Sequence, residues 1–288
     1  MHFVDAKGIL SPKNGMNIYR GCTHGCIYCD SRSECYGFTH DFEDVQVKRN
    51  APELLDDALR RKRRPAMIAT GSMCNPYQPC EAELGIMRRC LEIILRHRFG
   101  VAVHTKSDLV LRDLDLLCAI NERTRCVVQM TLTTYDEELC RKIEPRVCTT
   151  KKRYEVLKTL ASHGIPTVVW MTPALPFIND TEENLRGLLH YCFDAGVAAI
   201  LTFGFCVTLR RGDREYFYAA LDRLFPGLKK RYIATYGNSY VCPSPNSDKL
   251  YAILKRECEV RGILYNTDAV FRFIGEFPSV DDGQITLF

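Results

Sequence analysis

The 288-residue sequence contains no apolar run that approaches the roughly eighteen residues needed to cross a bilayer. Its first ten residues, MHFVDAKGIL, include no apolar segment of the kind found in a secretory signal peptide. No internal repeat or low-complexity stretch is visible, and the hydrophobic (46%) and charged (26%) fractions are ordinary. The absences exclude membrane-spanning and disordered classes, and they predict a cytoplasmic, folded protein.

Cysteine, in contrast, is abundant. Fifteen cysteines is an odd count for the disulfide framework of a secreted domain, and it suits a reducing compartment where thiols remain free to bind metal. We expect most of them to be small buried side chains. Twelve of the fifteen form no further C-x2-C or C-x3-C pair, so a second cluster is not expected.

The remaining three cysteines lie close together in residues 21–36, which read GCTHGCIYCDSRSECY. Cys22, Cys26 and Cys29 have C-x3-C-x2-C spacing. Iron-sulfur clusters are held by cysteine thiolates, and a four-iron cluster with three such ligands keeps one iron open to another molecule. This spacing therefore predicts a catalytic cluster site.

A tetrahedral zinc site is the alternative for this stretch. Zinc ligands usually come in repeated C-x2–4-C pairs, which makes the mixed spacing unusual for zinc. If zinc were bound, the fourth ligand would come from one of three nearby side chains: Cys35, His24 or His40.

Hydrophobic periodicity predicts about six strand-then-helix units, and such a succession implies parallel strands joined by right-handed crossovers. The predicted strands are residues 16–19, 66–70, 101–105, 126–133, 165–171 and 197–205. The predicted helices are residues 51–64 with Asn50 as cap, 79–97, 109–121, 150–163, 181–195, 213–224 and 246–261. The expected fold class is α/β, a partial (β/α)6 TIM-like barrel.

The pattern loosens beyond Pro226. We therefore expect a core of residues 1–225 and a C-terminal extension, residues 226–288, that packs on the barrel. Within the extension, residues 263–265 and 270–274 are predicted as short extended pieces, and residues 283–288 as a tail.

Functional side chains of α/β barrels lie on loops at the C-terminal ends of the strands. The three cysteines follow the first predicted strand, residues 72–78 the second and Lys106 the third, while Thr131 lies near the end of the fourth. We expect all of them to face one mouth of the barrel.

The cysteine motif, with Tyr28 before its last cysteine, resembles the signature of the radical S-adenosylmethionine (SAM) enzymes. Other segments resemble the branch of this superfamily named for spore photoproduct lyase, which is also called DNA-repair-photolyase-like. These segments are N-x-Y-R-G-C at residues 17–22, N-P-Y-Q-P-x-E at 75–81, the Thr105-Lys106 pair and I-E-P at 143–145.

The resemblance implies two cofactors, a four-iron four-sulfur (4Fe-4S) cluster and SAM, together with an electron donor such as a reductase, flavodoxin or ferredoxin. It also implies that Lys106 pairs with the SAM carboxylate and that Thr131, Ser72 and Tyr28 belong to the cofactor site. Lys106 as a solvated surface lysine and Thr131 as a buried strand threonine remain alternatives.

The chain departs from spore photoproduct lyase in two places. Asp30, and not an aromatic residue, follows the third motif cysteine. The hydrogen-donating cysteine of that enzyme is matched in position by Ser72, with Cys74 two residues on. Cys74 is thus the candidate catalytic hydrogen donor, with a packed thiol as the alternative.

The expected reaction is hydrogen abstraction by a 5'-deoxyadenosyl radical, and the resemblance favours a nucleic-acid lesion or nucleotide as substrate. A peptide or small-metabolite substrate, and a metal- or cluster-bearing binding module without catalysis, are the rival interpretations. The net charge is +4, and five positive side chains are consecutive at residues 60–64. This run is interpreted as a solvated helix end or as a phosphate contact.

Overall fold

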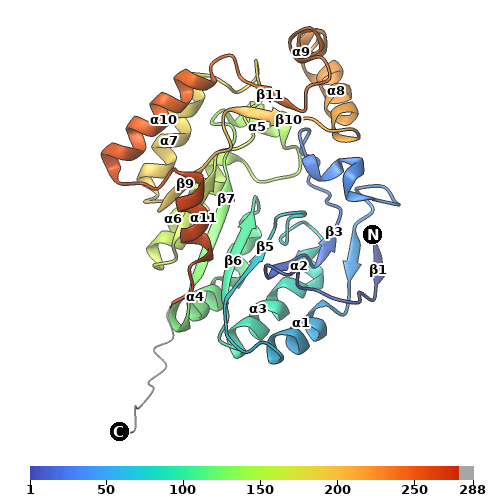
Figure 1. Ribbon diagram of the computed structural model, residues 1–288, viewed down its shortest axis with the longest axis vertical. Coiled ribbons are helices and arrows are strands. Elements are labelled where there is room, and N and C mark those ends of the chain that lie inside the picture. Colours follow the sequence, from blue (N-terminus) through green and yellow to red (C-terminus); the bar gives the residue numbers. More distant parts are fainter. Residues whose placement is uncertain (279–288) are drawn as a thin grey trace.

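In the computed structural model, which describes residues 1–278, six strands form one parallel sheet. They are β2 (Gly15–Met16), β5 (Met67–Thr70), β6 (Gly100–Thr105), β7 (Cys126–Thr131), β8 (Thr167–Trp170) and β9 (Ala199–Leu201). Their order in space equals their order in the chain, so each strand pairs with the next one (Figure 1). The predicted partial barrel of six βα units is confirmed.

The two faces of this sheet bury different sets of side chains. Val101, Val103 and Val128 point to the outer face and join the large core beneath the helices. Ala102 and Val127, which alternate with them, belong to a smaller cluster on the inner face. Both faces are therefore covered, which explains why β6 and β7 read as nearly continuous apolar runs.

Six helices supply apolar side chains to the core on the outer face. They are α1 (Ala51–Arg60), α3 (Ile86–Arg96), α4 (Leu114–Arg123), α6 (Thr150–Ser162), α7 (Glu182–Asp194) and α10 (Ser247–Arg261). The predicted helix over residues 109–121 begins as a 3-10 helix, η3 (Asp108–Asp113), and becomes α-helical only at Leu114, where α4 starts.

Two helix predictions need correction. The first predicted helix ends at Arg60. Asn50 occupies its N-cap position, but its side chain makes no cap hydrogen bond and bonds the backbone N–H and carbonyl of Ala6 instead. The predicted helix over residues 79–97 is divided at Gly85, whose φ is 58°, into α2 (Glu81–Leu84) and α3. The buried Glu81 carboxylate accepts from the N–H groups of Ile86 and Met87 at 3.1 and 3.0 Å, which satisfies the new helix start.

The chain enters the barrel through a second, three-stranded sheet in the order β1-β4-β3. Its strands are β1 (His2–Val4), β3 (Tyr19–Arg20) and β4 (Gln46–Lys48). The predicted first strand over residues 16–19 is accordingly shared between β2 of the barrel and β3 of this small sheet. Two 3-10 helices, η1 (Asp30–Arg32) and η2 (Glu34–Tyr36), follow the cysteine loop.

The last predicted strand, residues 197–205, is shorter in the structure, and a hairpin-like pair of β10 (Cys206–Thr208) and β11 (Val241–Pro243) follows it. Between these two strands lie α8 (Asp213–Leu224) and α9 (Leu228–Tyr236), of which α9 was not predicted. The periodicity also missed α5 (Glu137–Ile143), a helix of two turns after β7. The predicted helix over residues 246–261 is present as α10 (Ser247–Arg261).

The prediction of an extended piece over residues 270–274 is wrong, because these residues lie in α11 (Thr267–Gly275). Val270 and Ile274, one helical turn apart, pack into the inner-face cluster with Ala102, and α11 lies beside β9 (Figure 1). The piece over 263–265 does extend, since Leu264 bridges Ala199 in parallel. The tail over 283–288 lies outside the described residues.

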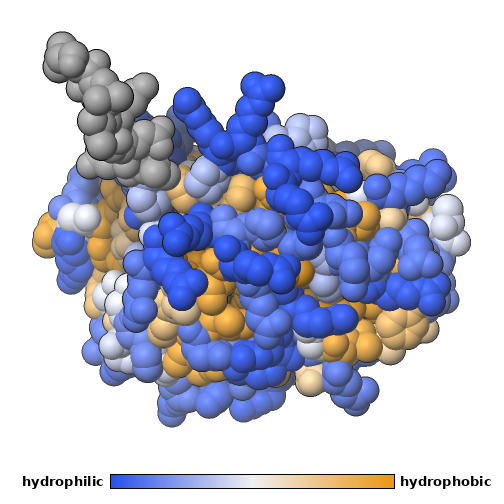
Figure 2. All heavy atoms as spheres, turned by 90° about the horizontal axis from the view of Figure 1, so that it is seen from below, coloured by the Kyte–Doolittle hydropathy of each residue, from blue (hydrophilic) through white to orange (hydrophobic). Residues whose placement is uncertain are grey.

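The run of five positive side chains, residues 60–64, is exposed at the end of α1, directly before β5 begins. Arg60 pairs with Asp56 at 2.6 Å and with Asp57 at 3.4 Å. Figure 2 shows the molecule from below Figure 1, where α1 and α4 lie, and long hydrophilic side chains project from that face. Within residues 1–278, no helix combines the length and apolar character required to span a bilayer.

Candidate functional site

A cavity of about 260 Å³ opens at the C-terminal ends of the barrel strands. All eight side chains that the sequence predicts for the site line it: Cys22, Cys26, Tyr28, Cys29, Ser72, Cys74, Lys106 and Thr131. The cavity wall also includes His24, Asn75, His104 and Trp170, which the sequence reasoning did not assign. The topology thus brings the predicted side chains together in one cavity, although Cys22 and Thr131 are 109 residues apart in the sequence.

The cysteine loop is held by backbone hydrogen bonds to distant segments. Cys22 donates its N–H to the Phe42 carbonyl at 3.1 Å, and Ile27 donates to the Ile143 carbonyl at 3.0 Å. Gly21 has a φ of 90°, and a Cβ there would lie 2.4 Å from the Phe42 oxygen. Only glycine allows the chain to approach Phe42 this closely just before the first motif cysteine.

The N-P-Y-Q-P-x-E segment is held beside the cysteine loop by the contacts of two of its side chains. Asn75 accepts from the Thr105 hydroxyl at 2.8 Å at the end of β6. Gln78 is buried against the cysteine loop, where it accepts from the Thr23 N–H and donates to the Gly21 carbonyl, both at 3.3 Å. The loop after β5 therefore fixes the shape of the cysteine loop.

The three motif cysteines are free thiols that converge on the cavity. Burial raises the pKa of Cys22 and that of Cys26 to about 11, and it raises the pKa of Cys29 as well. Metals bind the thiolate form of cysteine, so each of these thiols has to lose its proton when a metal group binds. The positive charge of the metal group then stabilises the buried thiolates.

The three motif sulfurs are not gathered as closely as the ligands of one tetrahedral zinc ion. A tetrahedral zinc site places its thiolate sulfurs about 3.8 Å apart. Within residues 1–278, the three motif cysteines are not among the groups whose ligand atoms all lie within 4.8 Å of one another. Of the zinc ligands considered from the sequence, Cys35 is exposed and contacts Arg210, and His40 lies beside His2, whereas His24 does line the cavity.

Lys106 is half-buried beside the cysteine loop and is not a solvated surface lysine. Its Nζ donates to the Tyr28 hydroxyl at 2.8 Å, lies 3.3 Å from Glu144 Oε1 and 3.7 Å from Cys26 Sγ. Burial acts to lower the pKa of Lys106, but Cys26, Tyr28 and Glu144 together hold it well above its usual range. The lysine is thus a fixed positive charge next to a motif thiol.

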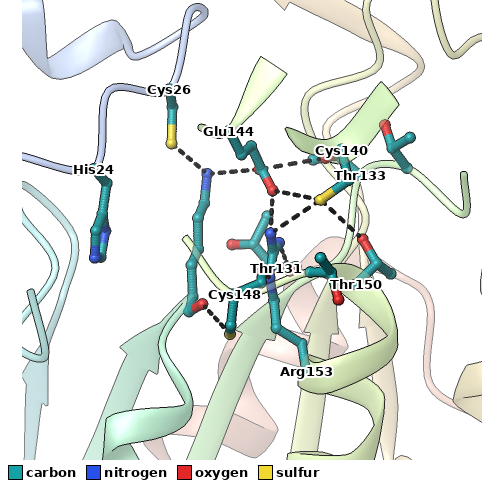
Figure 3. Close-up of polar contacts among 12 residues, drawn as sticks. His24, Cys26, Thr131, Thr133, Cys140, Glu144, Cys148, Thr150 and Arg153 are labelled. Atoms are coloured by element: carbon teal, nitrogen blue, oxygen red, sulfur yellow. Dashed lines mark hydrogen bonds and ion pairs between the residues drawn. The ribbon is translucent and has the colours of Figure 1, made fainter. Parts of the chain in front are cut away.

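Glu144 is the centre of the network that holds Lys106, and Figure 3 shows its carboxylate between Cys26 on one side and Arg153 on the other. Its side chain is fully buried, as is that of Arg153, which donates to Glu144 Oε2. Burial acts to raise the Glu144 pKa, but Arg153 and Lys106 lower it far below its usual range. The carboxylate is therefore ionised and compensated by two cations.

Arg153 extends the network to three further segments. It donates to the Thr131 carbonyl at 2.8 Å and to the Cys148 carbonyl at 2.9 Å, and Cys148 in turn donates its thiol to the Lys106 carbonyl at 3.2 Å. The ends of β6 and β7 and the start of α6 are joined through this one guanidinium group (Figure 3).

Thr131, His104 and Trp170 form the inner wall of the cavity. The Thr131 hydroxyl lies 2.8 Å from His104 Nε2, and the His104 ring stacks on Trp170 with 4.3 Å between centroids. Burial and the nearby Lys106 charge lower the pKa of His104 to about 3, so the ring is neutral. The wall therefore offers flat aromatic rings without charge.

Ser72 and Cys74 differ in exposure although they share one loop. Ser72 is exposed at the cavity mouth, whereas Cys74 is buried and donates its thiol to the Tyr19 carbonyl at 2.8 Å. Burial raises the pKa of Cys74 well above its usual range, so it remains a protonated thiol.

The comparisons with known proteins agree with this site. A profile of the Radical SAM superfamily matches residues 16–189, more than half of the chain. An uncharacterized protein of Mycobacterium tuberculosis (strain H37Rv) is 30% identical over 80% of this chain and 69% of its own length. An uncharacterized protein of Methanocaldococcus jannaschii is 32% identical over 62% of this chain and 67% of its own length.

Solved structures share the fold. Spore photoproduct lyase in complex with a dinucleoside spore photoproduct has a TM-score of 0.63 and 13% identity, covering 92% of this chain and 78% of that chain. Streptococcus suis SuiB bound to SAM has a TM-score of 0.53 and 9% identity, covering 88% of this chain and 49% of that chain.

The chain therefore belongs to the radical SAM superfamily. Its cofactors are a 4Fe-4S cluster and SAM, and like other radical SAM enzymes it needs an electron donor. The site fits such groups, since three free thiols and a fixed lysine charge meet in one cavity of the barrel.

Replacing Glu144 with Ala is expected to lower the free energy of unfolding by about 3–5 kcal/mol, because Arg153 would remain buried without its partner. Denaturant unfolding of the cluster-free protein measures this. Asp194→Ala, which removes the exposed partner of Lys158, is the control and should leave the midpoint nearly unchanged. A Glu144→Ala protein as stable as this control would show that Glu144 does not hold the network.

Proposed function

We propose that this protein is a radical SAM enzyme that removes a hydrogen atom from a nucleic-acid lesion or nucleotide. When bound, the cluster would deliver an electron to SAM, and the resulting 5'-deoxyadenosyl radical would abstract the hydrogen. The observation that carries the proposal is one cavity that combines the motif thiols and Lys106 with an aromatic wall. The protein's own residues would bind, orient and shield the reactants.

Cys22, Cys26 and Cys29 would hold the cluster. Each is free, each lines the cavity and each belongs to the single C-x3-C-x2-C stretch. Lys106 would bind the carboxylate of SAM, as its half-buried ammonium group already does with the carboxylate of Glu144. Tyr28, Ser72 and Thr131 would complete the cofactor site from the same walls.

Two features support a nucleic-acid or nucleotide substrate. The first is the stacked pair His104 and Trp170, since planar aromatic surfaces bind nucleobases irrespective of their sequence. The second is a groove of about 580 Å³ lined by Arg210, Arg211 and Tyr240. It adjoins the cavity along the chain, because Val207 and Thr208 line the cavity and the next residues line the groove.

The arginines of this groove could exchange their present partners for phosphates. Arg211 is 82% exposed and pairs with the exposed Glu34 at 3.0 Å, which is a weak interaction in water. The run of residues 60–64, in contrast, precedes β5 and lies at the opposite end of this strand from the cavity. We therefore assign phosphate contacts to the groove and interpret the run as a solvated helix end.

Cys74 remains the candidate hydrogen donor. It is a protonated thiol on the cavity wall, and a product radical needs such a hydrogen atom to complete repair. Its bond to the Tyr19 carbonyl would have to be exchanged for a contact with the substrate.

We expect each of the three single variants Cys22→Ala, Cys26→Ala and Cys29→Ala to form no complete cluster, because the remaining two thiolates cannot hold three of its irons. Anaerobic iron reconstitution followed by iron, sulfide and absorption measurements tests this. The exposed Cys35 gives the matched control, and Cys35→Ala should bind the cluster normally. Full cluster content in Cys26→Ala would refute the assignment.

Lys106→Met should weaken SAM binding roughly ten- to a hundredfold, which corresponds to the loss of one charge-assisted hydrogen bond of about 1.5–3 kcal/mol. Equilibrium binding to the cluster-loaded protein measures the change, and iron content is recorded for every sample. Lys158→Met, a change at an exposed lysine, should bind SAM normally. Equal affinity of the two variants would remove Lys106 from the cofactor site.

The proposed reaction is tested by anaerobic incubation with reductant, SAM and an oligonucleotide that carries a synthetic thymine-dimer lesion of the spore photoproduct type. We expect 5'-deoxyadenosine together with repaired thymines. Cys74→Ala should still form 5'-deoxyadenosine and should accumulate side products in place of repaired thymines.

Arg211→Gln should weaken binding of the oligonucleotide, whereas Arg63→Gln, at the other end of β5, should not. A wild-type protein that forms 5'-deoxyadenosine but neither binds nor alters the oligonucleotide would exclude this substrate class. Such a result would favour a peptide or small metabolite.

A further inference from the structure

A second group of metal-ligand side chains lies outside the cavity, between β1 and the segment that leads into β4. It consists of His2, His40 and Asp44, and one potential ligand atom from each lies within 4.8 Å of the others. In the described part of the chain, it is the one trio of His, Cys, Asp or Glu side chains that meets this limit. All three are half-buried.

The geometry points to a binding site for a divalent transition-metal ion such as Zn²⁺, held by His2, His40 and Asp44. Two imidazoles and one carboxylate are a ligand set that zinc uses widely. His2 Nδ1 and Asp44 Oδ2 are 2.9 Å apart, and the two histidine rings meet edge to face with 4.9 Å between centroids. Donor atoms of one tetrahedral ion lie at a similar separation.

The hydrogen bonding of His40 leaves one ring nitrogen ready for a metal. His40 Nδ1 lies 2.9 Å from the Asp41 carbonyl oxygen, and because a carbonyl only accepts, Nδ1 carries the proton. Nε2 therefore bears the lone pair, and it is buried without a hydrogen-bond partner among residues 1–278. Histidines that bind metals commonly donate their other N–H to a backbone carbonyl in this way.

Asp44 is an ionised ligand in its present surroundings. Its Oδ1 contacts the α-amino group of Met1 at 2.7 Å and its Oδ2 contacts His2, and these two partners lower its pKa. A metal ion could take Oδ2 and leave the contact of Oδ1 in place.

The ion would stiffen the turn that supports the cysteine loop. The Asp44 N–H donates to the Asp41 carbonyl at 2.9 Å and closes this turn, and Phe42 within it accepts from the Cys22 N–H. Next to Phe42, Glu43 pairs with Arg32 of η1. A metal ion that joins residues 40 and 44 to β1 would thus fix both contacts, and this consequence rests on the proposed role of Cys22 at the cluster.

The test uses the full-length chain without a polyhistidine tag, loaded with its cluster under anaerobic conditions and titrated with Zn²⁺ by calorimetry and metal analysis. We expect one zinc ion per chain, with an affinity that falls at least roughly tenfold in His40→Ala and in Asp44→Asn. His163→Ala is the matched control, since His163 is exposed and also bonds a backbone carbonyl through Nδ1. Circular dichroism verifies that each variant is folded.

Equal zinc binding by the wild type and by folded His40→Ala would overturn the site. The role in support of the cysteine loop is measured separately, as the rate at which a chelator removes iron from the zinc-loaded and zinc-free holoprotein. We expect slower iron loss with zinc in the wild type and no difference in His40→Ala, and an equal rate in the wild type would refute this role.

A variant with Cys22, Cys26 and Cys29 all changed to Ala separates this inference from the proposed cluster site. It should still bind one zinc ion through His2, His40 and Asp44. Loss of zinc binding in that folded variant would show that the zinc had entered the cysteine site.

Discussion

The site depends on a buried carboxylate that is compensated by two cations. Glu144 is fully buried between Lys106 and Arg153, and none of these three charges would be stable there without the others. Through them the cysteine loop, the ends of β6 and β7 and the start of α6 are joined. The position of Lys106 beside Cys26 therefore follows from the fold as a whole, and it does not depend on local backbone preference.

This arrangement has a consequence for the proposed cofactor site. Lys106 donates to Tyr28 and Glu144 in the structure, so its ammonium group is satisfied before any ligand arrives. A carboxylate that binds there can share this preorganised charge without the cost of ordering a flexible lysine. The neutral wall of His104 and Trp170 then completes a cavity in which charge is concentrated on one side.

Much of the fold and of the candidate site could be predicted from the sequence, because these features are encoded locally. The spacing of Cys22, Cys26 and Cys29 lies within one loop, and the position of Lys106 follows from its place at the end of a strand. The nearly continuous apolar runs of β6 and β7 indicated both strands, and the succession of strand-then-helix units predicted their parallel pairing. Roles of the individual side chains at the cofactors, by contrast, stay predictions.

The features that could not be predicted from the sequence depend on contacts between distant segments. Glu144 was read only as part of the I-E-P segment, since its partners Lys106 and Arg153 meet it after folding. Residues 270–274 were predicted as an extended piece, yet Asn266 accepts from the Ala269 N–H at 3.1 Å and starts a helix. That cap was a local signal for α11.

The contacts of the cysteine loop also determine when this loop can take its shape during synthesis. Its supports come from Phe42, from Gln78 and from Ile143, which leave the ribosome over a span of about a hundred residues. A nascent chain that has only the cysteine motif outside the ribosome lacks all three of these supports. Cluster insertion at the proposed site would thus follow the synthesis of four of the six barrel strands, and a stalled or truncated product would present three thiols without the contacts that shape their loop.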